Sequence, residues 1–165
     1  MKTALSRLEA LADTYKAKRS PNFPAQYIPR SKYSDKTAND LTRAVIDCFY
    51  YHSHFSTRLA STGTYRADLK KFIPSQQRSG LPDVFAIVSG RAVFVEIKIG
   101  SDTLSEVQKE TIQAIEKAGA AVFIAKDFAS FWQWFNNTFA PFDEGESLPF
   151  GPVECESAPE IPTLF

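Results

Sequence analysis

The sequence has 165 residues, which is enough for one domain to bury a hydrophobic core without disulfide or metal staples. Hydrophobic residues make up 44% and charged residues 23%, an ordinary composition for a soluble globular protein. No apolar run is long enough to span a membrane, and the first residues lack a signal-peptide core. We therefore expect a cytoplasmic protein with no membrane partner.

Two cysteines cannot form a zinc site alone or a disulfide framework. His52 and His54 form a His-x-His pair with no acid or cysteine at ligand spacing beside them. We expect this pair to be exposed at the end of a helix rather than to bind a metal.

The formal net charge of zero hides a strong asymmetry along the chain. Residues 1–82 carry 14 Lys and Arg against 6 Asp and Glu, residues 83–140 carry 5 against 7, and residues 141–165 carry none against 6. A basic N-terminal half fits a polyanionic partner. An unevenly charged solvated surface would explain the same numbers, and charge alone does not decide between the two.

The chain is predicted to begin with two helices separated by an arm. Apolar residues recur at helical spacing over about residues 3–18. Three prolines in residues 20–34 then favour a linker or extended arm. A second helix is expected to begin at Ser34 or Asp35, because both residues are good N-caps.

The rest of the chain alternates between strands and helices. Strands are expected at residues 55–61, 84–88, 92–97 and 121–125. Ser89-Gly90 predicts a tight hairpin turn. Residues 66–81 are polar and are expected to be irregular. Helices are expected over residues 105–118 and after Asp127.

This order predicts an α/β domain with one mixed β-sheet flanked by helices. We expect three regions: an N-terminal helix and Pro-containing arm over residues 1–34, the main domain over 35–140, and a tail over 141–165. The tail is acidic and Pro-rich, so it is expected to be disordered.

Three charged residues stand out within the predicted hairpin. Asp83 opens one strand, and Glu96 and Lys98 lie two residues apart on the next, so their side chains share one face. Antiparallel pairing lets Asp83 face Glu96. Burying these charges costs several kcal/mol unless they are paired or bind a metal. A divalent cation such as Mg²⁺ would relieve the repulsion of the carboxylates and bind phosphate oxygens.

The stretch SGLPDVFAIVSGRAVFVEIKIGSDTLSEVQ, from Ser79 to Gln108, carries these residues. It resembles the PD-(D/E)XK nuclease superfamily, and it is most similar to the VRR-NUC branch and to nucleases related to Holliday-junction resolvases. The matching positions are Gly80, Pro82, Asp83, Glu96, Lys98, Leu104, Ser105 and Gln108. The resemblance covers about residues 37–126 and implies a restriction-endonuclease-like core.

The resemblance also implies the chemistry of the site. Asp83 and Glu96, with the backbone carbonyl of Ile97, would bind Mg²⁺ or Mn²⁺, and Lys98 and Gln108 would complete the catalytic set. Lys98 could orient or deprotonate the attacking water, or stabilise the developing oxyanion. Gln108 has a second explanation, because Ser105-x-x-Gln108 is also a capping box.

The family places an acidic residue on the helix before the sheet, and Asp40 stands here where glutamate is more usual. Its shorter side chain leaves direct metal contact, water-mediated contact and a purely helical role open. In the last case Asp40 is simply favoured by the helix dipole in the first turn.

Basic and aromatic residues precede Asp83 along the chain. Such residues suit a surface that follows phosphates and stacks a base, although a solvated loop explains each of them singly. The candidate nucleic-acid-binding residues are Arg58, Tyr65, Arg66, Lys70, Lys71 and Arg78.

The preferred interpretation is therefore a Mg²⁺- or Mn²⁺-dependent DNA endonuclease that selects DNA by structure, with branched DNA among its substrates. The alternatives are a restriction-type, sequence-specific endonuclease and a nucleic-acid-binding module with an inactive site. A homodimer is expected, because cutting both strands usually requires two active sites. The sequence leaves open the choice between DNA and RNA and the preferred DNA structure.

Overall fold

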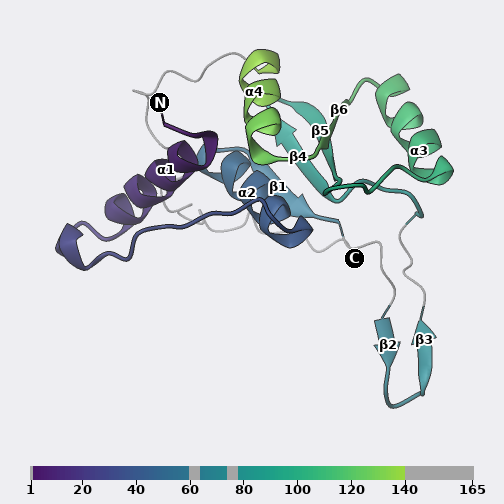
Figure 1. Ribbon diagram of the computed structural model, residues 1–165, viewed down its shortest axis with the longest axis horizontal. Coiled ribbons are helices and arrows are strands. Elements are labelled where there is room, and N and C mark those ends of the chain that lie inside the picture. The colour runs from purple at the N-terminus through teal and green to yellow at the C-terminus, as the bar shows by residue number, and fades with distance from the viewer. Residues whose placement is uncertain (1, 60–63, 74–77, 140–165) are drawn as a thin grey trace, which may run out of the picture.

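The computed structural model describes residues 2–59, 64–73 and 78–139, and its centre is a mixed four-stranded sheet (Figure 1). The sheet has the order β1-β4-β5-β6, where β6 is parallel to β5 and the other neighbours are antiparallel. Its strands are β1 (Phe55–Arg58), β4 (Val84–Val88), β5 (Arg91–Ile97) and β6 (Ala121–Ala125). The predicted α/β class, with a mixed sheet flanked by helices, is confirmed.

Helices flank this sheet. They are α1 (Ala4–Arg19), the short 3₁₀ helix η1 (Ala25–Tyr27), α2 (Ala38–Tyr51), α3 (Glu106–Lys117) and α4 (Phe128–Thr138). Figure 1 shows α2 and α4 on one side of the sheet and α3 on the other. None of the helices in the described residues is long and apolar enough to cross a membrane.

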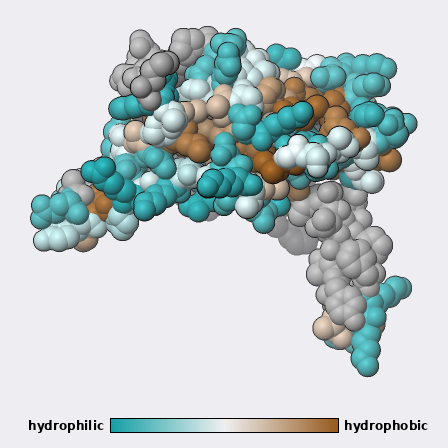
Figure 2. Space-filling model, viewed as in Figure 1, coloured by the Kyte–Doolittle hydropathy of each residue, from teal (hydrophilic) through white to brown (hydrophobic). Residues whose placement is uncertain are grey.

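The two faces of the sheet differ in what covers them. Val84, Val93 and Val95 are fully buried in the core that α2 and α4 build with the sheet. The opposite face carries Phe94 and Glu96, because alternate strand residues point to opposite faces. Figure 2 shows hydrophobic atoms gathered over the sheet between α4 and α3.

The β4–β5 turn sets the register of the hairpin. Ser89 and Gly90 both have positive φ, 49° and 78°, which is the conformation of a two-residue hairpin turn. The turn pairs Val84 with Val95, so Asp83 lies next to the end of β5 that carries Glu96. The expected tight turn is confirmed, and it places the charged residues.

Helix α1 shares the core of the main domain. Leu8 and Ala12 are fully buried, and α1 packs against α2 and α4. The arm then returns along α1, where the Ser31 amide donates to Asp13 at 2.7 Å and the Tyr33 amide donates to Glu9 at 3.0 Å. The packing of residues 2–34 is thus continuous with that of α2 and α4.

Helix α2 begins two or three residues later than predicted, since the expected N-cap was Ser34 or Asp35. Thr37 is the N-cap, and its hydroxyl accepts from the Asp40 amide. Asp35 instead accepts from the Phe128 amide at 3.0 Å, at the beginning of α4. Asp35 therefore accepts a hydrogen bond from a free amide in the first turn of α4 instead of capping α2. This is a tertiary contact, which the residues next to Asp35 do not indicate.

The prediction that residues 66–81 are irregular was wrong in part. Strand β2 (Thr64–Arg66) pairs antiparallel with β3 (Lys71–Ile73), which makes a separate two-stranded sheet. Lys70 has a φ of 46° in the turn between them. Strands of three residues give too short an alternation to be read from sequence. The predicted tail, residues 141–165, lies outside the described residues.

The expected exposure of the histidine pair was also wrong. His52 is the C-cap of α2, but its ring packs against Trp132 and Phe135. His54 is buried and lies against Phe135. Burial lowers the pKa of both imidazoles. The two rings therefore belong to the interface between α2 and α4.

Candidate active site

Asp83 is positioned by a tight approach between a glycine and α3. Gly80 has a φ of 79°, and a Cβ placed on it would lie 2.8 Å from the Val107 backbone oxygen and 3.0 Å from Thr111 Oγ1. Pro82 is fully buried. The chain therefore enters β4 along a fixed path, with Asp83 at its start.

The Asp83 carboxylate lies against the backbone of β5. Asp83 Oδ2 accepts from the Ile97 amide at 2.9 Å. The amide and carbonyl of one strand residue point to the same neighbouring strand, so the Ile97 carbonyl is also directed to the Asp83 side of β5. The structure thus brings together the Asp83 carboxylate and the backbone of Ile97.

Glu96 and Lys98 flank Ile97 on one face of the sheet. Their side chains are almost fully buried, with residue exposures of 2% and 7%. Lys98 Nζ lies 3.2 Å from Glu96 Oε1, which makes a buried ion pair. Charged residues at this depth require partners, because an unpaired buried charge is strongly unfavourable.

Gln108, in the first turn of α3, connects the ion pair to the helix. Its Oε1 accepts from Lys98 Nζ at 3.2 Å and from the Ser105 amide at 3.0 Å, and its Nε2 donates to Glu96 Oε1. Ser105 Oγ accepts from the Gln108 amide, so the capping box is complete. The two sequence interpretations of Gln108 are compatible: one side chain caps α3 and contacts both Glu96 and Lys98.

Asp102 is a neighbour that the sequence analysis missed. Its Oδ2 lies 3.3 Å from Lys98 Nζ, and its side chain is 59% exposed. The chain reaches it through a turn at Gly100, where φ is 62°. The sequence signal was a Gly-Ser-Asp turn directly after the strand that carries Lys98.

The charges of the site act on one another. Burial raises the pKa of the Glu96 carboxyl, and the negative charge of Asp83 raises it further, against the opposing effect of Lys98. Burial would lower the pKa of Lys98, but contacts with Glu96 and Asp102 outweigh it and the pKa is raised. The charge of Asp83 therefore disfavours the charged form of Glu96, while the two acids near Lys98 favour its charged form.

This donor set fits a hard divalent cation. Two carboxylates that repel each other and a backbone carbonyl directed to the same side are oxygen ligands of the kind that Mg²⁺ takes, and Mg²⁺ needs only one or two protein carboxylates. Within the described residues no group of three or more His, Cys, Asp or Glu side chains is gathered for a metal. The candidate ligands are Asp83, Glu96 and the Ile97 carbonyl.

Asp40 is not brought together with these ligands. Its Oδ2 accepts from Thr37 Oγ1 at 2.8 Å, and it lies in the first turn of α2. The structure therefore supports the helical role of Asp40, since a carboxylate is favoured near a helix N-terminus. A water-mediated metal contact stays a prediction.

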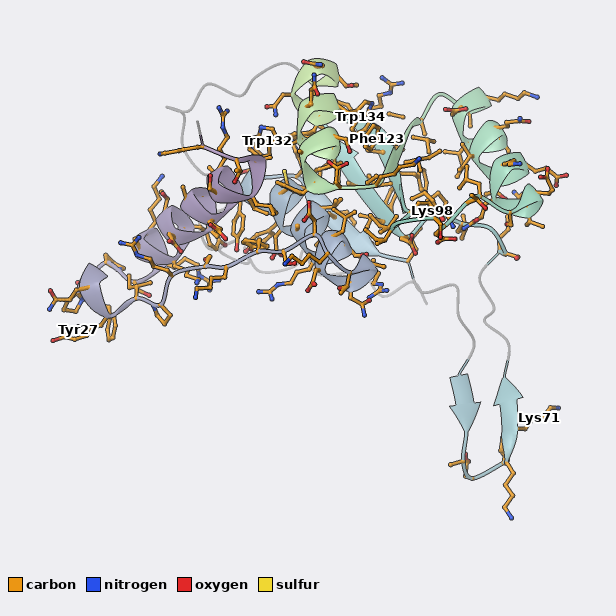
Figure 3. The ribbon with its side chains drawn as sticks, viewed as in Figure 1. Tyr27, Lys71, Lys98, Phe123, Trp132 and Trp134 are labelled. Atoms are coloured by element: carbon orange, nitrogen blue, oxygen red, sulfur yellow. The ribbon has the colours of Figure 1, made fainter. Side chains whose placement is uncertain are left out.

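The predicted nucleic-acid-binding residues lie in two places. Arg58 ends β1, where it pairs with Val84, and Arg78 is exposed shortly before Asp83. Lys70 and Lys71 are exposed on the β2–β3 hairpin, which Figure 3 shows away from Lys98. The side chains of Tyr65 and Arg66 lie outside the described part of the structure.

The role of Gly80 can be tested by substitution. Gly80→Ala is expected to lower the free energy of unfolding by about 1–3 kcal/mol, because the new Cβ meets the Val107 backbone and φ is positive. Gly90→Ala is the matched control, since its φ is 78° but nothing lies within 4 Å. Urea unfolding should show the larger loss for Gly80→Ala. Equal losses would mean that the contact with α3 is unimportant.

Comparison of the chain with protein-family models, with curated proteins and with solved structures found no match.

Proposed function

We propose that the chain is a metal-dependent nuclease of the PD-(D/E)XK type, with a restriction-endonuclease-like core. The observation that carries the proposal is the cluster of Asp83, Glu96, Lys98 and Gln108 where β4 begins and β5 ends, in which Glu96 and Lys98 are buried. Two adjacent carboxylates and a lysine on a largely buried sheet face cost free energy of folding, so they are not explained by stability. Such a group is favoured when it binds a cation and a phosphate.

The proposed substrate is a phosphodiester bond in DNA, selected by structure. A Mg²⁺ or Mn²⁺ ion held by Asp83, Glu96 and the Ile97 carbonyl would lower the pKa of a bound water and offset negative charge on the phosphate. Lys98, whose ammonium lies 3.2 Å from Glu96 Oε1, would orient or deprotonate the attacking water, or stabilise the developing oxyanion. Gln108 holds Lys98 and Glu96 in place.

Cleavage assays test this proposal. The protein is incubated with linear, nicked, flapped and four-way-junction DNA, and with RNA, in Mg²⁺, Mn²⁺ or EDTA. Cleavage that requires the metal and prefers one branched form is expected. Tight binding without turnover would favour a binding module with an inactive site, and a strong preference for one short base sequence would favour a restriction-type enzyme.

The hairpin bases are expected to contact phosphates without reading sequence. Lys70→Ala with Lys71→Ala should weaken DNA binding about equally across sequences and flatten the slope of log K against log salt by roughly one to two units. Both residues are exposed on the hairpin, so the fold should persist. Fluorescence anisotropy over a salt series measures the slope. An unchanged slope would exclude these two lysines from the DNA contact.

A further inference from the structure

A second candidate site lies at the N-terminal end of the molecule. A groove of about 490 Å³ runs between α1 and the arm, and Figure 3 shows this region, marked by Tyr27, at the opposite end from Lys98. Its volume is within the range of sites for small ligands, roughly 300–1,000 Å³. The groove is lined by Tyr15, Lys16, Arg19, Phe23, Pro29 and Tyr51, among others.

Tyr15 and Tyr51, which line the groove, belong to a group of tyrosines in mutual contact. The ring centroids of Tyr15 and Tyr51 are 5.4 Å apart, and those of Tyr15 and Tyr50 are 5.3 Å apart. The hydroxyls of Tyr15 and Tyr50 share a hydrogen bond, and Tyr33 Oη donates to Asp47 at 2.7 Å and lies 3.3 Å from Tyr51 Oη. The rings are therefore held in place before any ligand arrives.

Phe23, which lines the groove, and its neighbour Tyr27 expose their rings to solvent. Phe23 is 52% exposed and Tyr27 is 65% exposed, and their centroids are 6.3 Å apart. Tyr50 is also exposed. An isolated exposed ring is ordinary, but neighbouring rings beside a groove are typical of a binding surface.

The same region has an excess of positive charge. Residues 2–36 contain eight Lys and Arg against three acids. The three acids, Glu9, Asp13 and Asp35, each accept a hydrogen bond from a backbone amide. No ion pair to any of these eight bases is observed in the described part of the chain. The acids are thus hydrogen-bonded to the backbone rather than ion-paired with these bases, which leaves the region with an excess of positive charge.

Two of the bases lie directly in the groove. The Arg19 guanidinium carbon is 5.9 Å from the centroid of the Tyr15 ring, and Lys16 Nζ donates to the Pro29 carbonyl at 2.9 Å. A guanidinium, an ammonium and aromatic rings therefore line the same groove. That combination matches a flexible polyanion with flat rings, whose phosphates meet the cations while its bases stack.

We propose that this groove binds single-stranded nucleic acid, with a base stacked against Phe23 or Tyr27 and the backbone phosphates against Lys16 and Arg19. The site is separate from the Asp83–Glu96–Lys98 cluster and does not require cleavage. It would hold an unpaired strand away from the scissile phosphate. The chemistry favours an unpaired strand over a duplex, because the bases of a duplex are already stacked and their faces are inaccessible.

Binding of a fluorescein-labelled oligothymidylate, followed by anisotropy in EDTA, tests the proposal without any contribution from cleavage. Phe23→Ala with Tyr27→Ala is expected to raise the Kd about tenfold, the effect of losing one base–ring stack. Lys16→Ala with Arg19→Ala should also weaken binding and flatten its salt dependence by roughly one to two units. Blunt duplex binding should change less than twofold in the aromatic variant.

Matched controls separate the groove from general surface effects. Phe55 is 58% exposed on β1, so Phe55→Ala removes an exposed ring elsewhere. Arg91→Ala with Lys117→Ala removes two exposed bases outside the groove. Far-UV circular dichroism checks that each variant folds. Both controls should retain oligothymidylate binding.

Two results would overturn the proposal. One is an aromatic variant that binds oligothymidylate as tightly as Phe55→Ala does. The other is poly-glutamate binding that depends on Phe23 and Tyr27 when oligothymidylate binding does not, which would make the groove a site for an acidic peptide. Because the assay contains no metal, either result leaves the proposed nuclease function to its own test.

Discussion

Asp83→Asn should abolish metal-dependent cleavage, with a loss of at least about 10³-fold, and leave the fold intact. Asparagine keeps the shape and an acceptor for the Ile97 amide but removes the charge that a cation needs. Lys98→Ala should cause a loss of similar size, because it removes the ammonium group that would face the attacking water or the phosphate. Initial cleavage rates on the preferred DNA, with thermal melting to check the fold, measure both effects.

Asp102→Asn is the control for Lys98, because Asp102 contacts the same ammonium from an exposed position. It should retain activity within about tenfold, since exposed ion pairs contribute little. Asp83→Asn should bind DNA as well as the unaltered protein or better, because one negative charge near phosphate is gone. Full activity in Asp83→Asn would contradict the mechanism.

The elements around the site were predictable because their signals are local. Strand β6 has the expected bounds, and the turn at Ser89-Gly90 uses residues that tolerate positive φ. Ser105 and Asp127 are the N-caps expected from their side chains. Each of these features depends on a few adjacent residues, so the sequence alone contains the information.

Other elements depend on contacts between distant residues. Asp35 has the properties of an N-cap, yet it binds the start of α4, which is 93 residues away. The β2–β3 hairpin has strands too short for a clear alternation. The burial of His54 depends on Phe135 of α4. None of these partners can be inferred from neighbouring residues.

In the candidate site, too, some features follow from local sequence and others depend on tertiary contacts. Strand alternation predicts that Glu96 and Lys98 share a face, and the hairpin register brings Asp83 to them. The sequence did not reveal that Asp102 contacts Lys98, because that contact depends on how the turn after β5 packs. Nor did it reveal that Gln108 contacts Glu96 and Lys98 at once.

Gln108→Ala is expected to lower the cleavage rate about 10- to 100-fold, the usual effect of losing a residue that orients metal ligands. The change removes the donor to Glu96, the acceptor for Lys98 and the acceptor for the Ser105 amide. The free energy of unfolding should also fall by about 0.5–2 kcal/mol, since the capping box is lost. Cleavage rates at increasing Mg²⁺ and urea unfolding measure the two effects.

Ser105→Ala separates the two roles of Gln108. It removes the hydroxyl that accepts from the Gln108 amide but leaves the Gln108 side chain beside Glu96 and Lys98. Its stability should therefore fall about as much as in Gln108→Ala, while its cleavage rate and Mg²⁺ dependence stay near those of the unaltered protein. If Gln108 acts only through the cap of α3, both variants will lose the same activity. A raised Mg²⁺ requirement in Gln108→Ala alone would show that the side chain positions Glu96 for the metal.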